Sequence, residues 1–125
     1  MKNDELITEI HVPASKFAAH STYLKFKERD SMDFAIAAVA AAVTLGANKT
    51  VTEARLVLGG VAPIPWRVPR AEAALIGKTL NSEVLQSVAG IALGGAKPLE
   101  KNAYKIPLTQ TLVRRALAKA GGLNA

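Results

Sequence analysis

Three charged side chains in one segment offer the most promising chemistry of this sequence. Lys25, Arg29 and Asp33 recur at intervals of four residues, so two cations stand near a carboxylate. Cations of this kind recognise a phosphate or a ring oxygen, and a carboxylate can hold an arginine in position. The spacing is compatible with a ligand-binding role, which the residues by themselves leave open. Glu28 and Asp30 lie among these residues and leave local ion pairing as the alternative.

The other candidate residues point to no catalytic centre. His11 and His20 are the only histidines, and they are nine positions apart, which is not a helical metal-ligand spacing. No acid is placed to orient His20 beside Ser21 as the base of a nucleophile. The glycine pairs that begin at Gly59 and Gly94 match neither phosphate-loop motif, and we expect them to end a strand and a helix. We assign no catalytic residue and no metal ligand.

The composition limits the class of protein further. Cysteine is absent, which excludes disulfides, thiolate zinc sites and iron–sulfur clusters bound by this chain. No run of about 18 apolar residues occurs, and no hydrophobic signal core follows the polar start, so we expect no membrane partner. We expect a cytoplasmic protein, with the periplasm as the alternative for a complex that contains it.

The formal charge of +6 is concentrated towards the C-terminal end. Residues 97–125 carry six Lys and Arg against one acid, whereas the preceding residues are nearly balanced. Stacking on bases requires aromatic side chains, and this basic stretch contains only Tyr104. We therefore expect a solvated face or a protein interface there and no nucleic-acid partner.

The first half of the sequence has the alternation of β-strands. We predict strands at about 5–12, 22–29, 34–45 and 50–58. The segment 34–45 is rich in alanine and would also suit a helix. The short GANKT connection to the next alternating run favours a hairpin instead.

The second half has the pattern of helices. Prolines at 63, 65 and 69 predict an extended passage outside the sheet, and helices follow at about 69–76, 82–94 and 107–120. Strands followed by helices predict a single α+β domain spanning residues 1–125. We expect a mostly antiparallel sheet of three to four strands, covered on one face by the three C-terminal helices.

Several motifs resemble one family. They are ARLVLGGVAPIPWR at 54–67, KNAYKIPLTQTLVRRAL at 101–117, and the YLKFKERDSMDFAIA stretch that contains Lys25. Together they resemble the C-terminal domain of the FAD-binding (medium) subunit of molybdenum hydroxylases, the xanthine dehydrogenase, aldehyde oxidoreductase and carbon monoxide dehydrogenase family. The resemblance extends from about Asp4 to Leu117. It also implies the CO dehydrogenase flavoprotein C-terminal domain fold.

The resemblance implies a role in electron transfer from molybdenum through iron–sulfur clusters to FAD. It implies an N-terminal FAD domain of the same subunit as one partner, and molybdopterin and 2Fe–2S subunits as the others. That FAD domain, with its glycine-rich loops, has no counterpart in this sequence, so we expect an excised or separately encoded domain that binds FAD weakly by itself. Ile7 and Lys25 match flavin contacts, and Arg29 and Asp33 complete the predicted cofactor-binding set.

Two questions remain open from the residues alone: whether the chain is a stand-alone interaction module, and whether Trp66 serves in docking or in the core. A stand-alone interaction module would use the basic helix face of Arg114, Arg115 and Lys119 as a docking surface. Trp66, the only tryptophan, stands between Pro65 and Arg67 and suits either docking or core packing.

Overall fold

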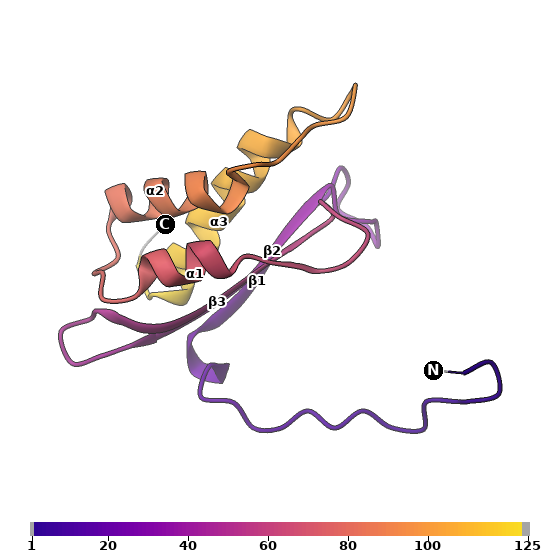
Figure 1. Cartoon of the computed structure of the whole chain (residues 1–125), viewed down its shortest axis with the longest axis horizontal. Helices are drawn as coiled ribbons and strands as arrows, with labels where there is room; N and C mark the ends of the chain where they lie inside the picture. The colour runs from indigo at the N-terminus through magenta and orange to yellow at the C-terminus, as the bar shows by residue number, and fades with distance from the viewer. Residues whose placement is uncertain (1, 124–125) are drawn as a thin grey trace.

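The computed structural model describes residues 2–123, which form a four-stranded antiparallel sheet with three helices on one of its faces (Figure 1). A single 3-10 turn, η1, precedes the sheet, whose strands follow the order β1-β2-β3-β4. This confirms the predicted α+β class. The elements in chain order are η1 (Ala18–His20), β1 (Ser21–Phe26), β2 (Ala37–Leu45), β3 (Val51–Gly59), β4 (Trp66–Arg67), α1 (Pro69–Leu75), α2 (Ser82–Leu93) and α3 (Lys105–Ala120).

The alanine-rich segment forms the strand β2, at the centre of the sheet. Val39 pairs with Leu24 of β1 and with Leu58 of β3, and all three side chains pack in the core under the helices. α3 packs against β2 and β1, and α1 packs against β3. Ladders on both edges of β2 outweigh the helix propensity of its alanines, whose small side chains let α3 approach closely.

Local sequence explains where the helices begin. Pro69 occupies the first turn of α1, where its missing N–H costs nothing. At the start of α2, the Asn81 side chain accepts a hydrogen bond from Val84 N–H at 2.9 Å. α3 begins at Lys105, two residues earlier than predicted, because a first turn also tolerates Pro107.

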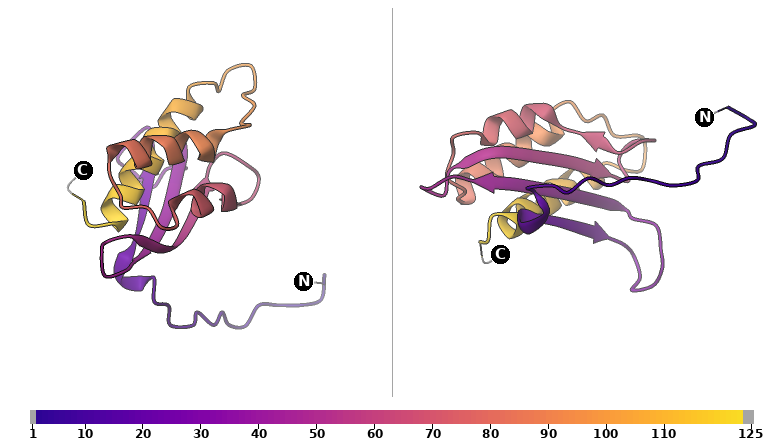
Figure 2. Two further views of the ribbon diagram at one scale, coloured as in Figure 1. Left: turned by 60° about the vertical axis from the view of Figure 1, so that its left-hand side comes forward. Right: turned by 90° about the horizontal axis from the view of Figure 1, so that it is seen from below.

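The predicted strand at 5–12 is wrong. Residues 2–16 are exposed and belong to no helix or strand of the structure (Figure 2). An alternating pattern makes a strand only where a neighbouring backbone offers a ladder, and none of the described strands lies beside this segment. The fourth strand is instead β4, inside the proline-rich passage that we expected to lie outside the sheet. We call residues 2–16 the arm.

The loop between β1 and β2 is longer than predicted, because β1 ends at Phe26 and β2 begins at Ala37. Ile36 N–H donates to the Phe26 carbonyl at 2.8 Å and closes the loop at its base. Lys27 turns back into the loop, where its Nζ lies 3.1 Å from Asp30 and 2.8 Å from the Ser31 carbonyl. Residues 27–36 therefore form one internally bonded turn rather than the ends of two strands.

Gly60 joins three parts of the fold. Its φ of 71° is left-handed, and a Cβ there would lie 3.1 Å from the carbonyl oxygens of Ala35 and Ile36. The Lys105 ammonium donates to the Gly60 carbonyl at 3.0 Å. The glycine of the LGGVAPIPWR motif thus brings the β1–β2 loop, the proline-rich passage and the start of α3 together.

Candidate functional site

One face of the sheet is left uncovered by the helices, and it carries the candidate site (Figure 2). Its central residues are small. Ala38 of β2 lies between Lys25 of β1 and Gly59 of β3. In the next row Tyr23 lies opposite Ala40. We call this surface the open face; it is made of Tyr23, Lys25, Ala38, Ala40, Val57 and Gly59.

The open face suits the close approach of a planar group or of another backbone. Alanine and glycine are small residues; Ala38 itself is buried at 2% exposed, whereas Tyr23 in the next row is 62% exposed beside the half-buried Ala40. Lys25 stands at the end of the face next to the β1–β2 loop, is exposed, and makes no ion pair with any described residue. A cation with free donors over a floor of small residues fits a phosphate or a ring oxygen.

Tyr23 is a site residue that we did not predict from the sequence. It lies two positions before Lys25 in β1, so the period of two residues places both side chains on one face. The alternation was visible in the sequence. Which face would remain uncovered was not, because that depends on where the helices pack.

Arg29 and Asp33 come together as predicted, but their contacts are with each other. Arg29 Nε and Nη2 donate to Asp33 Oδ2 at 3.3 and 3.1 Å, and Asp33 Oδ1 accepts from Phe34 N–H at 2.9 Å. No hydrogen bond or ion pair joins Lys25 to this pair. In this state the pair orders the loop that follows Lys25.

Ile7 lies in the arm, apart from the other predicted site residues. Its side chain is 64% exposed. The arm leaves the body of the protein on the side of the open face, opposite the helices (Figure 1). His11 contacts Glu9 at 2.8 Å within the same arm and lies far from any group of ligands.

The last residue of the arm, Lys16, and the next residue, Phe17, are attached to two residues of β3. The Arg55 guanidinium lies 5.4 Å from the centre of the Phe17 ring, a cation–π distance. The Lys16 ammonium pairs with the Glu53 carboxylate beside it. These contacts cover the end of the face near the β2–β3 hairpin, and Lys25 lies at the other end of β1.

A second arginine–carboxylate pair, which we did not predict, holds the far edge of the sheet. Glu72 of α1 accepts hydrogen bonds from Arg67 at 2.8 and 3.0 Å and from Leu56 N–H at 3.0 Å. Burial alone would raise the pKa of Glu72, but the bonds from Arg67 and Leu56 and the nearby positive charge of Arg55 outweigh it and lower that pKa. Glu72 thus attaches α1 and β4 to the edge of β3.

The described part of the chain contains no group of three His, Cys, Asp or Glu residues placed to hold a metal ion. Within residues 2–123 no helix has the length and apolar character needed to cross a membrane. On the basic face of α3, Arg114 is half-buried and donates to the Thr111 hydroxyl at 3.1 Å. Arg115 and Lys119 are exposed.

The family is decided by a match over most of the chain. Residues 21–120 match the model of the CO dehydrogenase flavoprotein C-terminal domain. The chain belongs to this family. The matched range of this flavoprotein C-terminal domain contains Lys25, Arg29 and Asp33, the whole sheet and all three helices.

Relatives of this flavoprotein C-terminal domain are subunits of larger enzymes. The carbon monoxide dehydrogenase medium chain of Hydrogenophaga pseudoflava is 32% identical over 96% of this chain and 42% of its own length. The aldehyde oxidoreductase FAD-binding subunit of Escherichia coli is 32% identical over 93% of this chain and 33% of its own length. The chain therefore spans less than half the length of these relatives.

A solved structure of carbon monoxide dehydrogenase from H. pseudoflava, in a form that lacks the Mo-pyranopterin moiety of its cofactor, has the same fold. Its similarity to this flavoprotein C-terminal domain reaches a TM-score of 0.75 at 34% identity, over 87% of this chain and 39% of that one. The predicted sheet-and-helix architecture of the family is thereby confirmed. The interaction-module alternative receives no support from these relatives.

Proposed function

We propose that this domain closes one side of an FAD site in a molybdenum hydroxylase complex and supports the packing of its subunits. Bound FAD would receive electrons that originate at the molybdenum centre and pass through iron–sulfur clusters. The domain itself would make or break no bond, since its described residues contain no nucleophile–base arrangement and no metal-ligand group. Its contribution is to position the cofactor and exclude water from it.

The main support is the placement of two parts of the chain. Lys25 lies opposite Ala38 on the sheet face away from the core, and the arm leaves the molecule on the side that no helix covers (Figures 1 and 2). Under the proposal Lys25 and Ile7 of the arm both contact the flavin, as the resemblance to the family implies. They come from different parts of the chain, and only the fold places both on one side. The exposed side chains of Lys25 and Tyr23 are available there to a cofactor or to the domain that holds it.

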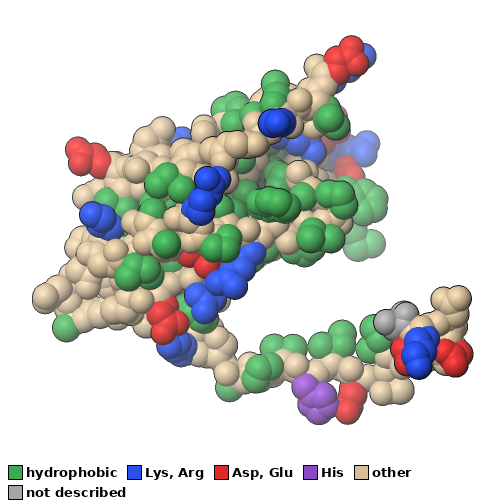
Figure 3. All heavy atoms as spheres, viewed as in Figure 1, with side chains coloured by type: hydrophobic (Ala, Val, Ile, Leu, Met, Phe, Trp, Pro, Cys, Tyr) green, Lys and Arg blue, Asp and Glu red, His purple; other side chains and the backbone are tan. Residues whose placement is uncertain are grey.

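The exposed apolar side chains of the arm also support the proposed function. Its apolar side chains Leu6, Ile7, Ile10 and Val12 are between 64% and 91% exposed, and Figure 3 shows hydrophobic side chains along it, apart from the rest of the molecule. Burying such residues is worth about 1.5–3 kcal/mol each. We infer that an FAD-binding domain of the same subunit covers the arm and supplies the strand ladder that its alternating sequence requires.

Each residue of the predicted set then has a role. The Lys25 ammonium would donate to a phosphate or ring oxygen of FAD, and Ile7 would contact the cofactor through its apolar side chain. Arg29 and Asp33 would hold the loop beside Lys25, and Arg29 could exchange one of its two bonds to Asp33 for a bond to the cofactor. Partner subunits would carry the molybdopterin and the 2Fe–2S clusters, and we place the complex in the cytoplasm, with the periplasm as the alternative.

Titrating FAD into the chain alone tests whether the domain closes a site rather than forms one. We expect no saturable quenching of flavin fluorescence, because the chain contains no glycine-rich loop for the pyrophosphate. Stoichiometric tight binding by this chain would overturn the proposal.

A chimaera tests Lys25 directly. The corresponding domain of the H. pseudoflava medium chain would be replaced by this one, and the FAD content per subunit and the FAD dissociation constant would be measured. Lys25→Ala should weaken FAD binding about tenfold, the loss expected for one charged hydrogen bond. Lys78→Ala, an exposed lysine in the turn after α1, is the matched control and should have no effect. Equal FAD affinity in both variants would remove Lys25 from the site.

A further inference from the structure

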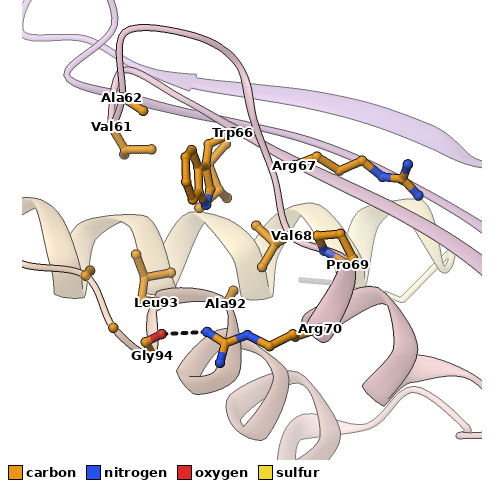
Figure 4. A pocket seen from close by; sticks show the side chains of 13 residues that line it. Val61, Ala62, Trp66, Arg67, Val68, Pro69, Arg70, Ala92, Leu93 and Gly94 are labelled. Carbon is orange, nitrogen blue, oxygen red and sulfur yellow. Dashed lines mark hydrogen bonds between the residues drawn. The ribbon is translucent and has the colours of Figure 1, made fainter.

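A groove lies between the proline-rich passage and the end of α2, on the helix side of the sheet (Figure 4). It encloses about 430 Å³. Val61 and Trp66 form one wall, and Ala92, Leu93 and Gly94 form the other. The groove is thus separate from the open face.

Trp66 is held rigidly at this groove. Its strand, β4, pairs with β3, where Leu58 lies opposite Trp66. The next residue, Arg67, turns its side chain away from the groove and is held by two bonds to Glu72 (Figure 4). Even so, Trp66 is 53% exposed and the neighbouring Ile64 is 64% exposed. A large aromatic side chain that is exposed on a backbone held in the sheet suits a docking anchor.

The charges around the groove have one sign. Arg70 lies at the groove end, where its Nη2 donates to the Gly94 carbonyl at 2.8 Å. A smaller hollow of about 70 Å³ adjoins the groove through shared residues and is lined by Lys97 and Lys105. No acidic side chain lines either hollow. Among the described residues, neither Arg70 nor Lys97 pairs with a carboxylate.

We propose that this groove docks an acidic segment of a partner polypeptide, with an apolar side chain seated against Trp66 and flanking carboxylates paired with Arg70 and Lys97. The apolar walls favour an apolar side chain at the centre of the bound segment. The cations favour acidic residues on either side of it and raise the rate of association. A nucleic acid fits less well, because Trp66 is the only aromatic side chain that lines the groove and the volume admits a few side chains.

Trp66 itself provides the measurement, since it is the only tryptophan of the chain. The full chain would be titrated with the peptides Glu-Glu-Leu-Phe-Glu-Glu, Ser-Ser-Leu-Phe-Ser-Ser and Lys-Lys-Leu-Phe-Lys-Lys while its tryptophan emission is recorded. We expect a saturable blue shift with the glutamate peptide, a weaker response with the serine peptide and none with the lysine peptide. Added salt should weaken the glutamate response.

Two variants locate the binding. Lys97→Ala changes an exposed loop residue. It should lower the affinity for the glutamate peptide by up to about fivefold, the effect expected from losing an exposed charge pair. Lys119→Ala, an exposed lysine of α3, should leave the affinity unchanged. The proposal is overturned if the three peptides act alike or produce no saturable shift. It is overturned equally if single-stranded DNA shifts the emission and the glutamate peptide does not.

Discussion

Arg29 and Asp33 lie four residues apart in the loop after β1, and Arg67 and Glu72 lie five residues apart across the start of α1. Both pairs have arginine–carboxylate contacts of hydrogen-bond length, at 3.1 and 2.8 Å. Their surroundings differ. The Arg29 side chain is 76% exposed and the Asp33 side chain is 25% exposed, whereas the Glu72 side chain is only 8% exposed.

The difference shows that burial, rather than spacing, decides what a charge pair does. Asp33 accepts from a backbone N–H within its own loop, so its bonds order residues that are neighbours in sequence. Glu72 accepts from Leu56 N–H, sixteen residues away at the edge of β3. The first pair can reorganise around a ligand at small cost, and the second joins a helix, a strand and the passage that carries Trp66.

Removal of the buried Glu72 carboxylate should cause the largest loss of stability. Glu72→Ala leaves the Leu56 N–H without an acceptor and Arg67 without its partner, so we expect the free energy of unfolding to fall by about 2–4 kcal/mol. Denaturant unfolding followed by circular dichroism measures it. The matched control is Glu100→Ala, an exposed acid of the loop before α3, which should change stability by less than about 0.5 kcal/mol. A loss no larger than that of the control would show that Glu72 does not hold the sheet edge.

Neutralising Glu72, by substitution or by acid pH, should cause a smaller loss of stability. Glu72→Gln keeps an acceptor for Leu56 N–H but removes the charge, and should cost about 1–2 kcal/mol at neutral pH. Because folding lowers the pKa of Glu72, the stabilisation is complete above the unfolded value of about 4.3 and is lost as the pH falls through the lower folded value. The stability gap between the native protein and Glu72→Gln should therefore narrow as the pH falls below about 4.3. A gap that stays constant down to pH values near 2 would contradict the lowered pKa.

The exposed pair should yield the smallest effects. Arg29→Ala should lower the free energy of unfolding by less than about 0.5 kcal/mol, because solvent screens the pair. Asp33→Ala also removes the acceptor of Phe34 N–H and should cost about 1 kcal/mol. Thermal and denaturant unfolding of both variants provide the values. A loss from Asp33→Ala as large as that from Glu72→Ala would mean that the loop is part of the stable core.

Much of the fold could be predicted from local sequence. The alternation at 50–58, the prolines before α1 and the Asn81 cap each act within a few residues, so the ends of most elements fall close to where the pattern places them. The arm and β4 could not be predicted, because a strand requires a partner, and the partner of Trp66 is Leu58, eight residues back across a turn. For the same reason Arg29 and Asp33 were found from their spacing, whereas the link between Glu72 and Leu56 was not.

The class of fold and the family follow from the sequence alone, because periodicity, capping and motif residues are local properties. The tertiary structure decided which face of the sheet remains open, that Tyr23 and Lys25 share it with the emerging arm, and that Glu72 is buried against Leu56 while Trp66 is not buried. These outcomes depend on how three helices cover one face of a sheet. Contacts between residues distant in sequence exist only after that packing is complete.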